Sequence, residues 1–178
     1  MRALGALLFL ASATPILAQY EMRKSSDGVL IVSNVFGRTY TLDVPGRTIV
    51  PYGKNEADHP YLNIDGTFLQ ILSVPLVQFD ADASAGDEAV LRQQMKYEAN
   101  NYDVPLASID SHTREVGGRT ALIWSFLPTS GPHPVRQIFH TFRAGGYVVV
   151  IGSSIDREQD KSSVESLLAR IAGSFHST

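Results

Sequence analysis

The stretch "FRAGGYVVVIGSS", residues 142–154, decides the fold, because its paired glycines fit either a phosphate-binding loop or a tight turn. A phosphate-binding glycine loop follows a strand and opens a helix, whose first amide groups face the anion. The residues after Gly146 read "YVVVIG", a β-branched run that continues a strand instead. We therefore predict a two-residue hairpin turn at Gly145 and Gly146, where glycine supplies the positive φ angles.

Pairing across this turn predicts which side chains share a face of the sheet. A two-residue loop places His140 opposite Ile151. It also places Phe142 opposite Val149, and the residues between these positions point to the other face. Both faces are apolar, so His140 is expected to be a core histidine with satisfied polar atoms.

A second pair of glycines, Gly117 and Gly118, joins "LASIDSHTREV" to "RTALIWSFL" and predicts another hairpin. The strand after the turn is apolar on both faces, and its Trp124 is expected to lie in the core. A strand that is apolar on both faces must be covered on both faces.

The remaining chain predicts further strands and two helices. Strands are expected at 29–35, 38–44, 61–64 and 68–79, with an Asp-Gly hairpin turn at 65–66. Pro75 lies inside the last run, which predicts an edge or a bulge there because proline cannot donate to a ladder. Residues 20–27 are polar and expected to be poorly ordered, and 47–60 are expected to form a long connection.

The two helices are predicted from apolar spacing. Residues 84–103 can place Leu91 and Met95 on one face, with Ser84 and Asp87 as caps and a stop at 100–101. Apolar residues at 164, 167, 168 and 171 follow the helical rule. Asp160 and Ser162 lie near the start of this helix as cap candidates, and Gly173 stands where a C-cap glycine belongs. The order of elements predicts an α+β domain, an antiparallel sheet flanked by helices on both faces.

The first 18 residues read as a secretory signal peptide: Arg2 precedes a short apolar run and small residues, with Ala13 and Ala18 as alternative cleavage points. The alternative is an uncleaved membrane anchor, which the short run disfavours. We predict cleavage after Ala18, a short polar segment at 19–27 and a single domain over 28–178. The expected location is periplasmic or secreted, without stable membrane insertion after cleavage.

Charge and composition exclude several functions. Cleavage takes only Arg2 from the 15 basic residues and leaves 14 against 18 acidic ones, a balance of −4. This balance does not favour nucleic-acid binding. The chain has no cysteine, which excludes disulfides, thiol catalysis and thiolate metal sites. None of the five histidines forms a zinc motif, and no nucleophile elbow is present, so no catalytic residue, metal or cofactor is predicted.

One loop carries candidate binding residues. The segment "NEADHPY" groups Glu56, Asp58, His59 and Tyr61, and its carboxylates and imidazole could bind a divalent cation weakly. The spacing matches no known metal site, so a polar surface loop is the preferred interpretation. These four residues remain candidates for a surface site.

The order of elements resembles the PsbP-like superfamily, which includes the extrinsic subunit of photosystem II, the Ran-binding protein Mog and exported bacterial proteins of the DcrB and LpqN types. The similarity runs from the strand "YTLDVP" through "FLQILSVP", the middle helix, "GGRTALIWSF" and "VRQIFHTFRAGGYVVVIGSS" to a last helix that ends "IAGSF". The resemblance implies an α/β/α sandwich and a role in docking to partners more than in catalysis. It implies no particular site residue.

These observations favour an exported, non-enzymatic binding or accessory protein that acts through a protein partner or a surface groove near 47–61. The first alternative is a small periplasmic hydrolase or lyase with an unrecognised site, which a deep pocket with perturbed titratable groups would favour. The second is a carrier of a small apolar ligand, which predicts an apolar cavity of at least about 300 Å³.

Overall fold

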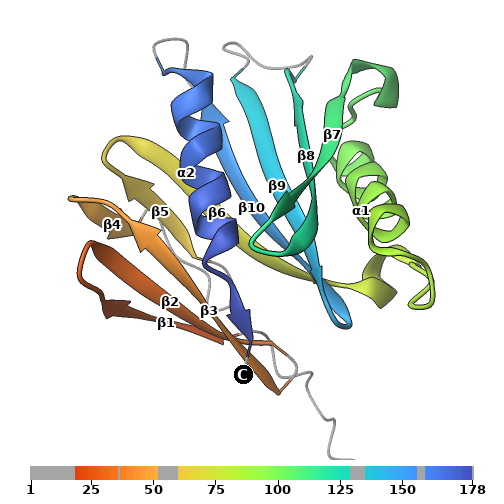
Figure 1. The fold of residues 1–178 in the computed structure, drawn as a ribbon. Helices are drawn as coiled ribbons and strands as arrows, with labels where there is room; N and C mark the ends of the chain where they lie inside the picture. The colour runs from red at the N-terminus through yellow and green to blue at the C-terminus, as the bar shows by residue number, and fades with distance from the viewer. Residues whose placement is uncertain (1–18, 36, 52–59, 129–134, 156–158, 178) are drawn as a thin grey trace, which may run out of the picture.

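A computed structural model describes residues 19–35, 37–51, 60–128, 135–155 and 159–177. It is an α+β protein in which two antiparallel sheets pack with two helices (Figure 1). The smaller sheet has the strand order β1-β2-β3-β11, and the larger has the order β4-β5-β6-β10-β9-β8-β7. The early strands therefore form a sheet of their own, which the sequence did not predict.

The smaller sheet contains a strand where disorder was predicted. Its members are β1 (Gln19–Lys24), β2 (Gly28–Val35), β3 (Arg38–Pro45) and β11 (His176–Ser177). The prediction for 20–27 is wrong because β1 pairs with β2 along its whole length. Of the β1 side chains, Tyr20 packs against the core, whereas Glu21, Met22 and Arg23 are exposed, so pairing with β2 rather than burial holds this strand.

The larger sheet contains both predicted Gly-Gly hairpins. Its strands are β4 (Ile49–Pro51), β5 (Tyr61–Ile64), β6 (Thr67–Pro75), β7 (Asp110–Val116), β8 (Arg119–Phe126), β9 (Arg136–Ala144) and β10 (Tyr147–Ile155). The predicted connection at 47–60 is wrong where β4 pairs with β5. The predicted register of β9 and β10 is confirmed, with His140 opposite Ile151.

Positive φ angles explain the tight turns. Gly117 and Gly118 both have positive φ, 58° and 73°, and so do Asp65 and Gly66, as type I′ turns require. In the β9–β10 turn only Gly145 has a positive φ, 65°, which corresponds to a type II′ turn.

Pro75 ends a strand instead of bulging it. β6 lies inside the sheet between β5 and β10, but its pairing with β5 covers only residues 67–70. Pro75 pairs with Tyr147 of β10, and the 3₁₀ helix η1 (Leu76–Phe79) follows at once. The predicted strand to residue 79 is therefore too long, because the chain turns into a helix after the proline.

The two predicted helices are confirmed, and of the predicted N-terminal caps only Asp160 is observed in that role. α1 (Asp87–Asn101) has Gly86 as its N-cap without a side-chain hydrogen bond, so neither Ser84 nor Asp87 caps it. α2 (Lys161–Gly173) is capped by Asp160, whose side chain accepts hydrogen bonds from the amides of the two serines that follow Lys161. Gly173 is the last helical residue, and Ser174 takes the cap position. A short 3₁₀ turn, η2 (Leu106–Ser108), precedes β7.

Two hydrophobic cores lie on opposite faces of the larger sheet. α1 packs on the face that carries Leu122 and Trp124, whereas α2 packs on the face that carries Ala121 and Phe142. The predicted sheet between helices is confirmed in part: two helices pack against the sheets, but the structure has two antiparallel sheets where one was predicted. The face under α2 is also covered by the inner side of the smaller sheet, through the residues Ile31, Val35, Tyr40, Leu42 and Val44.

Candidate functional site

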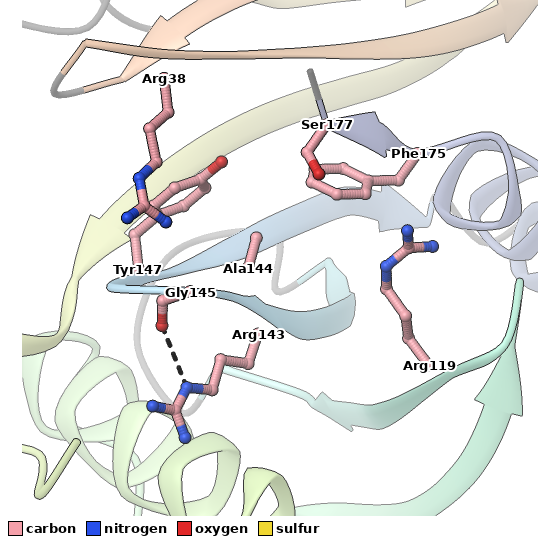
Figure 2. A pocket seen from close by; sticks show the side chains of 8 residues that line it. All are labelled: Arg38, Arg119, Arg143, Ala144, Gly145, Tyr147, Phe175 and Ser177. Carbon is pink, nitrogen blue, oxygen red and sulfur yellow. Dashed lines mark hydrogen bonds between the residues drawn. The ribbon is translucent and has the colours of Figure 1, made fainter. Parts of the chain in front are cut away.

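An arginine-lined pocket opens where the two sheets and the C-terminal strand meet. Its volume is about 400 Å³, and its lining comes from β3, β8, the β9–β10 turn, β10 and the end of the chain after α2 (Figure 2). Three arginines line it, together with Tyr147 and Phe175, and none of its described lining residues carries a carboxylate. We call it the arginine pocket.

Strand alternation places two of these arginines on the inner faces of the sheets. Arg38 is the first residue of β3, on the same side as the buried Tyr40 and Leu42. Arg119 is the first residue of β8, on the same side as the fully buried Ala121. Each arginine therefore continues an inward-facing pattern at a strand end, where its charged head can reach solvent while its stem packs on apolar neighbours.

The guanidinium of Arg119 lies over an aromatic ring. Its guanidinium carbon lies 4.7 Å from the ring centroid of Phe175, a cation–π contact. One guanidinium nitrogen, Nη1, donates to the carbonyl oxygen of Gly117 at 3.1 Å. Within the described part of the chain Arg119 has no acidic partner, so most of its donors remain available to a ligand.

Arg38 lies in a space that a glycine leaves open. A Cβ atom added to Gly145 would lie 2.8 Å from Nη1 of Arg38, so the guanidinium packs against the turn backbone. Among the described residues we find no hydrogen bond or ion pair for Arg38. Its charge acts on the neighbouring Tyr147.

Tyr147 contributes a neutral hydroxyl to the floor of the pocket. The pKa of Tyr147 is raised to about 12, mainly by burial and also by the nearby Tyr40, with the charge of Arg38 opposing both effects. The phenol therefore stays protonated at physiological pH and can donate a hydrogen bond. The ring of Tyr147 stacks on that of Tyr40 at a centroid distance of 6.1 Å, which fixes its position.

The third arginine has a structural role. Figure 2 shows the side chain of Arg143 directed away from Tyr147 and Phe175. Its guanidinium donates to the carbonyl oxygens of Ala83, Ala85 and Gly145, and lies 3.5 Å from a carboxylate oxygen of Asp87. Arg143 therefore links the segment before α1 to the β9–β10 turn. Its guanidinium already has carbonyl acceptors and the carboxylate of Asp87 as partners.

This arrangement suits an anion. Guanidinium groups offer several N–H donors in a plane that matches carboxylate and phosphate oxygens. The volume lies in the range of small-molecule sites. The described lining contains no histidine or carboxylate, so it offers no evident general base.

Of the four residues of the predicted loop site, the structure describes only Tyr61. Glu56, Asp58 and His59 lie outside the described residues. Tyr61 begins β5, pairs with Gln70 and stacks on Phe68 at 6.2 Å between ring centroids. By strand alternation it faces the α1 side of the larger sheet, opposite to the arginine pocket. Sequence reasoning missed Arg38 and Arg119, although both begin strands at inward positions.

A second group of interest lies at the end of α1. Burial raises the pKa of the half-buried Glu98. The pKa of the adjacent Tyr102 is also raised, by burial and then by the charge of Glu98.

Over the described ranges, no cluster of three metal-ligating side chains occurs. Nor do those ranges contain a helix with the length and apolarity needed to span a bilayer.

Comparisons with known proteins identify no family. No family model and no curated protein matches this chain. One solved structure, a protein from Bacteroides thetaiotaomicron VPI-5482, is similar with a TM-score of 0.52 and 8% sequence identity. The match covers 78% of this chain but only 45% of that one. This chain thus spans less than half the length of that protein, and the likeness concerns the fold alone.

Proposed function

We propose that the protein is an exported, non-enzymatic binding protein that takes an anionic group of its ligand or partner into the arginine pocket. The observation that carries the proposal is the pair Arg38 and Arg119, which line one pocket without a carboxylate in its described lining. The chain as a whole is acidic, with a formal net charge of −3, so this local excess of positive charge stands apart from the average surface.

The pocket favours anions for two physical reasons. A hydrogen bond between a charged donor and a charged acceptor is shorter and roughly twice as strong as a neutral one. The buried rings of Tyr147 and Phe175 form a wall of low dielectric constant behind the guanidiniums, which strengthens their attraction for an anion. Because the site is open to solvent, added salt should weaken binding.

Calorimetric titration with inorganic phosphate, acetate and benzoate tests the proposal. We expect binding that weakens with added sodium chloride and that is also weaker in Arg38→Gln and in Arg119→Gln, each of which keeps one of the two guanidiniums. The matched control is Arg92→Gln on α1, which removes an exposed ion pair with Glu88 on the other face of the sheet. Binding that all three variants retain equally, or no binding of any anion, would overturn the proposal.

Export and family membership are further parts of the proposal. The signal-like first 18 residues support a periplasmic or secreted location. Fractionation of expressing cells should recover the processed chain outside the cytoplasm.

The antiparallel hairpins and a helix on each face support distant membership of the PsbP-like superfamily. Superposition on a solved PsbP-like protein should align β6-β10-β9-β8-β7 in the same order, and another order would contradict membership.

The alternatives make different demands on the site. An apolar-ligand carrier needs an apolar cavity, whereas the arginine pocket carries guanidiniums at its wall. A hydrolase or lyase is favoured only by the neighbouring raised pKa values of Glu98 and Tyr102. Turnover of an ester or glycoside panel that disappears in Glu98→Gln and persists in Arg38→Gln would favour the enzyme. Capture of a periplasmic partner that Arg38→Gln loses would favour the binding protein.

A further inference from the structure

We infer that the arginine pocket is built for a short dianion, a ligand with two carboxylate or phosphate groups joined by a small apolar spacer. Arg38 would pair with one end and Arg119 with the other. The inference rests on the proposed function and makes it more specific, because anion binding alone does not require two charges on the ligand.

The first argument is the position of Arg119 in the larger sheet. The register that places Ala121 opposite Phe142, continued by two residues, brings Arg119 beside Ala144. Ala144 in turn pairs with Tyr147. These three residues form a row across β8, β9 and β10, and strands lie about 4.8 Å apart, so the row is roughly 10 Å long. Arg119 stands at one end of this row.

The second argument is the position of Arg38 at the other end. It comes from the smaller sheet and lies against Gly145, the residue that follows Ala144 in the turn. Its charge acts on Tyr147, the far member of the row. Figure 2 shows Arg38 beside Tyr147 on one side of the pocket and Arg119 below Phe175 on the other, with Ala144 between them.

The third argument is the chemistry of the surface between the two guanidiniums. Ala144 and the rings of Tyr147 and Phe175 are apolar, so a spacer of methylene groups or a flat ring fits there without losing hydrogen bonds. A monoanion that pairs with one guanidinium leaves the other charge without a partner. A dianion pairs with both, and the hydroxyl of Tyr147 can donate to the end near Arg38.

Matched acids that differ in one charge test the inference on the full chain. Calorimetry compares adipate with hexanoate and terephthalate with benzoate, at equal ionic strength. For the wild-type protein we expect the dianion to bind about tenfold more tightly than the monoanion of the same body, since a second charged contact contributes at least that factor. A diphosphonate of the same spacer length shows whether phosphate or carboxylate ends are preferred.

Single arginine variants separate this inference from the proposed function. In Arg38→Gln and in Arg119→Gln we expect the dianion preference to fall to about twofold, the statistical advantage of two equivalent ends. Thermal melting checks that each variant is folded, and Arg38→Lys and Arg119→Lys should keep part of the preference. Equal binding of monoanions and dianions to the wild-type protein would overturn the dianion inference and leave the proposed function intact. No binding of any of these acids would overturn both.

Discussion

His140 lies directly opposite Ile151 in the β9–β10 ladder, and both side chains are completely buried. Neither ring nitrogen of His140 has a hydrogen-bond partner among the described residues. The sequence predicted a core histidine with satisfied polar atoms, and only the burial is confirmed. The pKa of His140 is lowered from 6.5 to about 4, mainly by burial and also by electrostatic repulsion from the nearby Arg114 and His112.

This histidine should make the protein less stable in acid. An unfolded chain binds a proton at this residue below about pH 6.5, whereas the native state does so only below about pH 4. The free energy of unfolding should therefore fall as the pH drops from 6.5 to 4, by about 3 kcal/mol in total from this group. Urea unfolding at a series of pH values measures the loss.

Two variants isolate the contribution of His140. In His140→Leu the drop in stability between pH 7 and pH 4.5 should be smaller by most of that amount. The variant has no imidazole at this position that takes up a proton when the chain unfolds. The exposed His176 of β11 is the control, and His176→Gln should keep the wild-type slope. A His140→Leu profile parallel to the wild type would show that the buried imidazole does not control the acid sensitivity.

Alanine at Gly145 should lower both stability and anion affinity. The residue has φ +65°, where a side chain costs about 1 kcal/mol, and the new Cβ would lie 2.8 Å from Nη1 of Arg38. Gly118→Ala is the matched control, because Gly118 has φ +73° but open space around the added atom. We expect similar losses of stability in both variants and a loss of phosphate or benzoate affinity only in Gly145→Ala. Gly146→Ala, with neither constraint, should change little.

Gly152 should tolerate no side chain, for a packing reason. A Cβ atom there would lie 2.8 Å from Nε2 of Gln70 and from two ring carbons of Phe139. Phe139 is stacked on Trp124 at a centroid distance of 4.2 Å and cannot easily move away. Gly152→Ala should therefore destabilise the fold by about 1–3 kcal/mol, measured by thermal or urea unfolding. A loss no larger than that of Gly146→Ala would show that the core adapts at this position.

Processing should leave the first strand of the smaller sheet complete. Cleavage after Ala18 makes Gln19 the new N-terminus, which is also the first residue of β1. Intact-mass measurement of the exported protein should give a chain that begins at Gln19. Cleavage after Ala13 would give a longer product, and a mass that retains Met1 would indicate the uncleaved anchor.

The local parts of the fold were predictable from particular residues. The Gly-Gly pairs at 117–118 and 145–146 define hairpins because positive φ angles and β-branched flanks leave few alternatives. The register of His140 and Ile151 then follows from the length of the turn. The prediction of poor order for residues 20–27 was wrong for residues 20–24, which pair with β2. The error arose because an edge strand of polar residues has nearly the same composition as a disordered N-terminal segment.

The amino-acid sequence by itself determined the turns, the strand register and the two-sided burial of the central strands, since these depend on neighbours within one hairpin. Only the tertiary structure decided that a second sheet shares the face under α2, and that Arg38 and Arg119 line the same pocket. The physical reason is that the two arginines belong to different sheets and are far apart in the chain. Their approach depends on how the sheets stack, and hydrophobic burial is non-directional, so the pattern of apolar residues does not specify that stacking.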